Sequence, residues 1–513
     1  MRTRRVLLWR TGTITGATAA SAILGGCNLR TVWSAVPRML SRQVTLRVYL
    51  PTLAEAGTTQ TEWRALFKQA MKVALKEIPR AVEVSYVVGE GPRQWFPRGA
   101  SGPPATLFNF TGKGSPVHPP VEDPSIPMPD IVVAPHFWLE GYLAVRAQDL
   151  SPALKVAGRA LPQSTLRLGR AYAGKRGTIQ AGLPMLRQPM VCRAPHSALT
   201  VARGSRPWGR DAFALFLRSL SKQYPSGPLA DVPFATFTRP FSAAHTPPTP
   251  LEQLDVYIDS GLAGALALDA GGRLARSNEA VFATAPALQG ILSGIRWLAS
   301  VTPYSNPSCK NPGVMRIGEY AVFLGFFARS IGVFPVGWTM SGKALPLQEG
   351  VPVPHGPFGR RGSVLMPLPG TRSPVSTLDV MVWKGSKYAD TATQLAIALV
   401  GPAAQRVLAT WGRALAVHSG VAVQQLGQWT DGTNAALLAD TERDATMEDM
   451  YGALTDSGLA QQGKVRGSLL SGLKNVAKYA GGFVVGCWGN ARPLSPEAAK
   501  QVLAKAQRTA NGA

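Results

Sequence analysis

Val44-Thr45-Leu46-Arg47-Val48-Tyr49-Leu50 is the stretch that decides the fold class, because its apolar and polar residues alternate as in a half-buried β-strand. From Trp63 to Ile78, apolar residues recur three and four positions apart, which predicts an amphipathic helix that ends at Pro79. A second strand is predicted at 82–88. A strand, a helix and another strand in this order predict a parallel sheet and therefore an α/β protein.

Further strands and helices are predicted along the chain. Strands are expected at 129–133 and 379–383 and one long helix at 390–411, while Leu183-Pro184 is expected to interrupt another strand-like stretch. A C-terminal helix is predicted from Ser495-Pro496-Glu497, since serine is a common N-cap and proline fits the first helical turn.

Length and charge restrict the kind of protein. The chain has 513 residues, more than the roughly 250 to 300 that one hydrophobic core supports, so two lobes are expected. Its formal charge of +25 raises the prospect of nucleic-acid binding. No recognition helix, aromatic RNA motif or zinc module accompanies that charge, so no nucleic-acid partner is predicted. An anionic envelope surface, an acidic habitat or an acidic ligand explains it instead.

The first residues predict export. Arg4-Arg5 is followed by a weakly apolar run and by Leu24-Gly25-Gly26-Cys27, which resembles the lipobox of bacterial lipoproteins. Residues 1–26 are then a signal peptide, Cys27 is lipidated and 27–43 form a spacer. The run before Cys27 is too short and too rich in small residues to span a bilayer. The arginine pair also resembles a twin-arginine signal, although an ordinary basic start explains it equally well.

The other cysteines, Cys192, Cys309 and Cys487, have no C-x-x-C spacing and no histidine cluster beside them. No metal and no cofactor are therefore predicted. One disulfide with a spare thiol is compatible with this number, but three unlinked thiols are favoured.

Seven segments in the right order resemble the bacterial extracellular solute-binding proteins of ABC importers, in the group that includes maltose-binding protein. They are Pro129–Val133 with Gly141-Tyr142 and Leu150-Ser151-Pro152, Gly177–Pro184, Arg206–Asp211, Asp269–Arg273 taken as a hairpin, Ser277-Asn278, Ile317–Val322 and Lys384–Lys387. Two segments depart from the family pattern. A proline-rich stretch at 89–130, typical of a long surface loop, replaces a helix, and Met190-Val191-Cys192-Arg193 replaces a strand that usually contains asparagine.

The resemblance implies a two-lobed, periplasmic-binding-protein-like α/β fold of type II, with a ligand cleft between lobes joined by three hinge crossings. The implied lobe 1 is 44–188 plus 366–412, the implied lobe 2 is 189–365 plus 413–510, and the hinges are 186–190, 364–374 and 410–420.

The resemblance also implies which residues contact the ligand. His136-Phe137-Trp138 follow a strand end at which sugar-binding relatives place an aromatic and a polar side chain. Trp138 would supply a flat apolar platform with an N–H donor, and the alternative is a tryptophan packed under the next helix. His136 would be a polar contact, or else a hydrogen-bonded loop histidine.

Five more candidates come from the hinge and from lobe 2. Arg187 and Gln188 lie where relatives carry a polar contact, and Arg187 would pair with a carboxylate or with sugar hydroxyls. A solvated arginine on the hinge surface is the alternative. Phe326 and Phe327 follow the Gly318 pattern, so one is expected to face the cleft and the other the core. Trp338 is a weaker candidate.

The sequence therefore predicts a monomeric, lipid-anchored protein on the extracytoplasmic face of the bacterial membrane. It would capture a sugar, polyol or sugar acid and deliver it to ABC permease subunits, with a carbohydrate as the leading ligand class. No enzyme is predicted, because G-x-S-x-G, H-E-x-x-H and G-x-x-x-x-G-K-[ST] are absent, and Asp255 with Asp259 fits a polar face. The alternative is a solute-sensing or surface-adhesion lipoprotein of the same fold without transport.

Overall fold

The computed structural model describes a large part of the chain. The described residues are 43–51, 58–89, 129–136, 139, 143–157, 161–195, 209–213, 215, 234–236, 257–258, 261–276, 279–305, 322–328, 332–335, 363–411, 414–427, 430–452, 458–479 and 496–512.

The predicted strand, helix and strand at the start of the fold are confirmed. They are β1 (Val44–Pro51), α3 (Thr58–Glu77) and β2 (Val82–Gly89). β1 and β2 are parallel, with Val44 opposite Val82. The apolar face of α3 is buried where its period predicts, through Trp63, Phe67, Ala70, Met71 and Ala74.

One mixed sheet extends through the molecule. Its main path is β11 (Gly332–Pro335), β10 (Val322–Ala328), β6 (Leu183–Pro195), β13 (Ser373–Val382), β3 (Ile131–Pro135), β1 and β2. Four further strands pair with members of this path: β12 (Ser363–Met366) and β14 (Leu415–Ala416) with β6, β15 (Asp444–Ala445) with β13, and β7 (Phe234–Thr236) with β10. β3 is parallel to β1, and β13 is antiparallel to both β3 and β6. The carboxyl ends of β1 and β3 therefore point the same way as β6.

Strand β6 corrects one expectation, because Leu183-Pro184 begins a 13-residue strand instead of interrupting one. The pairing with β13 shifts register between Leu378 and Asp379, which lie opposite Leu186 and Pro184. A β-bulge tolerates a residue without an N–H donor, and this is why a proline fits here.

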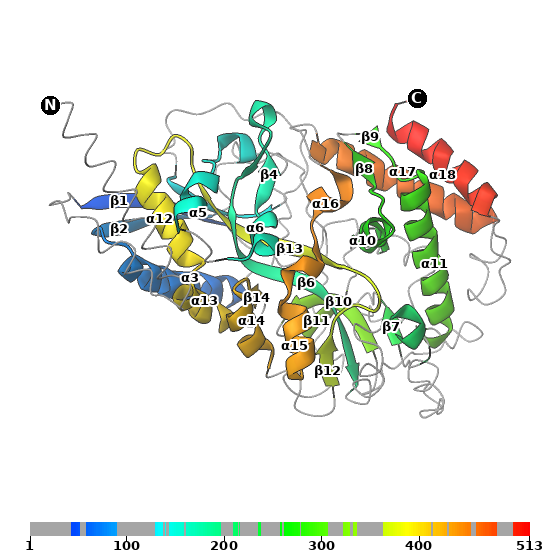
Figure 1. Cartoon of the computed structure of the whole chain (residues 1–513), viewed down its shortest axis with the longest axis horizontal. Coiled ribbons are helices and arrows are strands. Elements are labelled where there is room, and N and C mark those ends of the chain that lie inside the picture. Colours follow the sequence, from blue (N-terminus) through cyan, green and yellow to red (C-terminus); the bar gives the residue numbers. More distant parts are fainter. Residues whose placement is uncertain are drawn as a thin grey trace.

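Four hydrophobic clusters of described residues border the sheet, and the two with the most residues, here called the two cores, define the two lobes (Figure 1). The core of lobe 1 packs β1, β3 and the first half of β6 against α3. The core of lobe 2 contains Cys192 and Met366 and packs against helices that come later in the chain. Figure 1 shows the lobes side by side, with β6 and β13 running between them. The predicted two-lobed α/β fold is confirmed.

Lobe 2 is built mainly from helices: α10 (Leu262–Asp269), α11 (Ala285–Ser305), α16 (Met447–Tyr451), α17 (Gly458–Tyr479) and α18 (Pro496–Ala510). The C-terminal helix starts at the predicted proline. The hairpin expected at 269–273 lies slightly later, where β8 (Ala275–Arg276) pairs with β9 (Glu279–Ala280). Cys192 is a buried free thiol, while Cys309 and Cys487 lie outside the described residues.

The long helix predicted at 390–411 is wrong, because the chain forms α12 (Ala389–Leu399) and α13 (Pro402–Ala409). Gly401 is extended and Pro402 occupies the first turn of α13. A proline cannot continue the preceding helix, because it lacks the N–H donor and its ring clashes with the previous turn. Both helices nevertheless cover the core of lobe 1.

Short elements complete the fold. They are α5 (Ser151–Ala157), α6 (Gln163–Arg167), α14 (Ser419–Leu426), α15 (Gly432–Ala439), the paired strands β4 (Arg170–Tyr172) and β5 (Thr178–Gln180), and the 3-10 turns η3 (Ala144–Arg146), η4 (Gly174–Arg176) and η5 (Thr441–Arg443). No described helix combines the length and the hydrophobicity that crossing a bilayer requires.

The chain passes between the two cores inside β6, between β12 and β13, and along α14 and α15. The residue boundaries of the lobes remain a prediction.

Candidate functional site

The carboxyl end of β3 brings a histidine against an aspartate at the junction of the lobes. His136 directly follows β3, and Asp379 lies on the neighbouring strand β13, opposite Ala134. His136 Nδ1 is 2.7 Å from Asp379 Oδ2, and the two residues are 6% and 0% exposed. Ligands of α/β sheets bind at the carboxyl ends of the strands, so this pair lies at the end of lobe 1 where a ligand is expected. It fixes the start of the segment that continues into Phe137 and Trp138.

A second buried pair lies on the strand that both lobes share. Arg187 on β6 is 0% exposed. Its Nη1 donates to both carboxylate oxygens of Asp444, at 3.0 and 2.8 Å, and its Nη2 donates to the carbonyl oxygen of Leu438. Of the two sequence alternatives, the solvated surface arginine is therefore wrong, and the carboxylate partner belongs to the protein itself. Breaking such a pair leaves a buried charge and typically costs about 3 to 5 kcal/mol.

The surroundings of Asp444 act on its pKa in opposite directions. Burial raises the pKa, while the charges of Arg187 and Arg167 lower it and the charge of Asp440 raises it again. Burial prevails, and the pKa of Asp444 is raised to about 6. This carboxyl group therefore titrates close to neutral pH.

Arg167 connects the lobes directly. Its α6 packs beside lobe 1 through Leu166, and its Nη1 donates to Asp449 on α16, whose neighbour Met450 belongs to the core of lobe 2. Its Nη2 also donates to the carbonyl oxygen of Asp444 at 2.8 Å. Asp449 closes the capping box of α16 with Thr446. One arginine thus bonds both to the helix cap of the other lobe and to the Asp444 strand.

Strand register places five of the predicted site residues near this junction. Arg187 pairs with Thr377 on β13, next to Leu378, which pairs with the residue before His136. Gln188 is buried. On the other side of β6, Phe326 of β10 lies opposite Met190, and Phe327 follows it. The expectation that one of these two phenylalanines faces the cleft stays a prediction. Phe137, Trp138, Trp338 and Cys27 lie outside the described residues.

Asp379 and Asp444 were not among the predicted site residues. Asp379 is the one charged residue of the buried strand β13, and a charge in such a strand is a usable signal for a buried polar contact. Asp444 has no comparable signal, because its partner Arg187 is 257 residues away.

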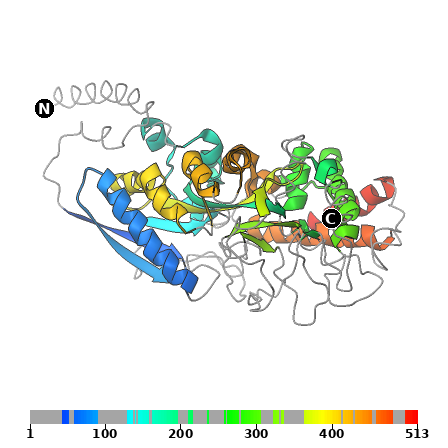
Figure 2. The same cartoon turned by 90° about the horizontal axis from the view of Figure 1, so that it is seen from below.

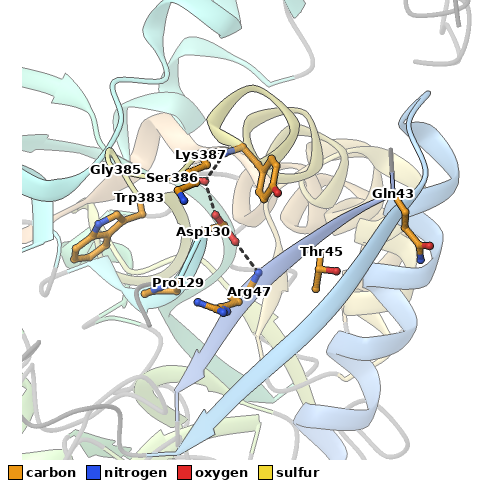
Figure 3. Close-up of a pocket in the computed structure, with 10 residues that line it drawn as sticks. Gln43, Thr45, Arg47, Pro129, Asp130, Trp383, Gly385, Ser386 and Lys387 are labelled. Atoms are coloured by element: carbon orange, nitrogen blue, oxygen red, sulfur yellow. Dashed lines mark hydrogen bonds between the residues drawn. The ribbon is translucent and has the colours of Figure 1, made fainter. Parts of the chain in front are cut away.

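A separate pocket of about 500 Å³ lies at the opposite edge of the lobe 1 sheet (Figure 3). Its lining residues are Gln43, Thr45, Arg47, Pro129, Asp130, Trp383, Gly385, Ser386, Lys387 and Tyr388. They come from the start of β1, the start of β3 and the segment after β13. This edge holds the amino ends of the parallel strands, so the pocket is distinct from the junction of the lobes.

The acidic side chain of this pocket is already bonded. Figure 3 shows Asp130 between Ser386 and the backbone of Arg47: Ser386 Oγ donates at 2.5 Å and the Arg47 N–H at 2.8 Å. Arg47 and Lys387 make no ion pair with any described residue. Nowhere in the described part of the chain do three His, Cys, Asp or Glu side chains gather to hold a metal ion.

This chain resembles known proteins in its fold but not in its sequence. No protein-family model matches the chain, and no curated protein matches it. Solved structures do match. The sugar-binding protein MalE from Xanthomonas citri aligns with 13% identity and a TM-score of 0.51, over 91% of this chain and 98% of that one.

Two further solved structures also align with nearly the whole of this chain. The maltose-binding protein MalE from Listeria monocytogenes, solved with maltose, has 11% identity and a TM-score of 0.51, over 91% of this chain and 97% of its own. The solute receptor AcbH, described as exclusive for β-D-galactopyranose, has 13% identity and a TM-score of 0.50, over 92% and 98%. From nearly complete coverage of these chains, together with two cores on one shared sheet, we conclude that this chain has the two-lobed fold of the MalE-like solute-binding proteins.

Proposed function

We propose that this protein is the substrate-binding lipoprotein of an ABC importer, and that it captures a carbohydrate between its lobes. The observation that carries the proposal is the fold, in which two lobes share a sheet and the carboxyl ends of β1 and β3 point toward the junction. The similar structures are described as binding sugar, maltose and β-D-galactopyranose, which supports a sugar as the ligand.

Closure of the lobes would couple binding to delivery. A ligand that turns an equilibrium from about 99% open to about 99% closed must favour the closed state by about 5.5 kcal/mol. That free energy requires contacts from both lobes at once. Phe137 and Trp138 would provide the lobe 1 side, with an aromatic face for the C–H groups of a sugar ring. Phe326 or Phe327 would provide the facing side.

The buried pairs would act as supports and not as ligand contacts. His136 is fixed by Asp379, so the backbone that leads into Trp138 starts from one defined position. The Nη atoms of Arg187 donate hydrogen bonds to Asp444 and to the carbonyl oxygen of Leu438. Arg187 thereby joins β6, the strand that both lobes share, to the chain segment that follows α15. A rigid frame of this kind limits motion to the passages between the cores.

Attachment and transport complete the proposal. The lipobox-like sequence at Cys27 supports a diacylglyceryl anchor at the extracytoplasmic face of the membrane, reached through a signal peptide of either export type. From there the closed protein would hand its sugar to permease subunits. Two acyl chains give durable attachment where a single chain does not.

The test is a thermal-shift screen of the protein against sugars, sugar acids, polyols and phosphorylated small molecules. A ligand at about 100 times its dissociation constant adds about 2.7 kcal/mol to the free energy of unfolding and raises the melting temperature. For a sugar that stabilises, Trp138→Ala should weaken binding at least tenfold.

Tyr388→Ala is the matched control, because Tyr388 is an exposed aromatic residue of the pocket at the opposite edge. It should leave sugar affinity within about twofold, or roughly 0.4 kcal/mol. If Tyr388→Ala weakened sugar binding and Trp138→Ala did not, the sugar would bind in that pocket and the proposed site between the lobes would be wrong. No stabilisation by any carbohydrate would contradict the proposed ligand class.

A further inference from the structure

The outer face of α3 carries an unusual row of positive charge. Arg64, Lys68, Lys72 and Lys76 recur at intervals of four residues, so they lie along one side of the helix. The row rises by about 18 Å from first to last at 1.5 Å per residue. The three lysines are exposed and Arg64 is half-buried. The opposite side of α3 is the buried side that contains Trp63 and Phe67.

This charge is not neutralised within the described structure. None of the three lysines makes an ion pair with a described residue, and the Nζ of Lys68 instead lies 5.5 Å from the ring centroid of Tyr86. The acidic residues of the helix are Glu62 and Glu77, at its two ends. Like charges four residues apart destabilise a helix. A row that disfavours its own helix is better explained by a partner than by folding.

The position of the row indicates the partner. β1 and β2 are parallel with Val44 opposite Val82, so α3 runs back between them and ends at Glu77, beside the start of β1. Figures 1 and 2 both place α3 at the periphery of lobe 1. The chain that precedes Val44 leads to the proposed lipid anchor, and the spacer at 27–43 spans at most about 60 Å when extended.

The amino edge of the lobe 1 sheet, beside which α3 ends, carries further positive charge on the sheet face that α3 does not cover. Arg47 and Lys387 line the pocket there, whereas the carboxylate of Asp130 is bonded to Ser386 and to the Arg47 backbone. Basic residues close to an anionic leaflet are attracted to it by about 1 kcal/mol each, within a Debye length of the surface.

We propose that the α3 row of Arg64, Lys68, Lys72 and Lys76 is a docking surface for the anionic lipid headgroups of the membrane to which the chain is tethered. The inference rests on the membrane attachment in the proposed function. Docking orients lobe 1 with α3 toward the bilayer, and lobe 2 remains free to move. A row of four basic side chains along a helix matches an extended charged surface better than it matches a single small anion.

The test uses the full chain with Cys27→Ala, so that no lipid anchor contributes. Binding is measured by co-sedimentation with vesicles of phosphatidylcholine containing phosphatidylglycerol, and with vesicles of phosphatidylcholine alone. At about fivefold per lysine, Lys68→Glu/Lys72→Glu/Lys76→Glu should weaken binding to the anionic vesicles by about 100-fold. Ionic strength of about 1 M, where the Debye length is about 3 Å, should abolish binding.

The control is Lys464→Glu/Lys500→Glu/Lys505→Glu, which makes the same charge change at exposed lysines on α17 and α18 of lobe 2. It should leave vesicle binding within about threefold. Lys68→Arg/Lys72→Arg/Lys76→Arg should bind like the parent. Equal losses in the two glutamate variants would mean that overall charge is responsible, and that would overturn the proposal. So would absence of binding to anionic vesicles.

The sugar screen separates this proposal from the proposed function. The α3 glutamate variant should still be stabilised by whichever sugar stabilises the parent, since Lys68, Lys72 and Lys76 are exposed and lie on the part of α3 that leads back to the amino ends of β1 and β2. That stabilisation also shows that the variant is folded. Loss of vesicle binding with sugar binding retained supports docking, while vesicle binding without any sugar response overturns only the solute-binding proposal.

Discussion

Asp444 shows how one residue can combine opposing electrostatic effects. Its carboxylate accepts two hydrogen bonds from Arg187, which favours the charged form. Its complete burial favours the neutral form more strongly, so the pKa rises to about 6. In an unfolded chain the same group has a pKa of about 3.9.

This difference makes the stability depend on pH. Between about pH 4 and 6 the folded protein holds a proton on Asp444 that the unfolded chain has lost, so this group contributes stability below pH 4 and that contribution is lost as the pH rises through 6. The free energy of unfolding of the parent, measured relative to Asp444→Asn by urea denaturation, should fall by about 1.4 kcal/mol per pH unit in that window. A flat difference would show that Arg187 offsets the burial.

Residue-scale contacts were the least accessible to sequence reasoning. His136 and Arg187 were chosen from local patterns, a strand end and a predicted hinge, and their predicted contact with a ligand stays a prediction. Their partners Asp379 and Asp444 lie 243 and 257 residues away. Such pairs depend on the order of strands in the sheet, which no local period reveals.

At the scale of elements, close packing of α10 against α11 depends on missing side chains. A Cβ added to Gly290 on α11 would lie 2.2 Å from the carbonyl oxygen of Leu266 on α10. Backbone atoms cannot move aside as a flexible side chain can. The two helices therefore approach more closely than any other residue at this position would permit.

Gly290→Ala should destabilise the protein by about 2 to 3 kcal/mol, the cost of overpacking a tight contact. Gly467→Ala on α17 is the matched control, because a Cβ there would meet no atom within 4 Å. It should stabilise by about 0.5 to 1 kcal/mol through better helix propensity. Urea denaturation of both variants measures this, and equal effects would contradict the close approach.

Most elements followed from local pattern, and the errors have local reasons. β1, α3, β2 and the start of α18 were predicted because their apolar periods are complete and their ends are marked by proline or serine. The prediction of one helix at 390–411 was wrong because the apolar period continues through Gly401-Pro402, although the proline ends the first helix there. The expectation that Pro184 interrupts a strand was wrong, because a bulge in the β6–β13 pairing tolerates a proline that is normally excluded from central strands.

At the scale of the molecule, the two lobes are not independent units. β6 contributes Leu186 to one core and Cys192 to the other. β13 lies between β6 and β3. Loss of either strand removes part of both lobes.

We therefore expect a single cooperative unfolding transition in differential scanning calorimetry. Leu186→Ala in the lobe 1 half of β6 and Gly290→Ala in lobe 2 should lower the same melting temperature without dividing the transition. Large-to-small core substitutions cost about 2 to 5 kcal/mol, which is enough to separate two transitions if the lobes unfolded alone. Two resolved peaks, only one of them moved by each substitution, would contradict this expectation.

The place of β13 in the sheet also has a consequence for how the protein is made. β13 pairs with both β3 and β6, yet its first residue, Ser373, is synthesised nearly 180 residues after Pro195, the last residue of β6. At about 5 to 20 residues per second, the early strands lack their central partner for many seconds. During that interval neither lobe can complete its sheet, and the proposed export signal at the other end of the chain has already been synthesised. A chain whose folding is delayed in this way can still be threaded through a narrow membrane channel.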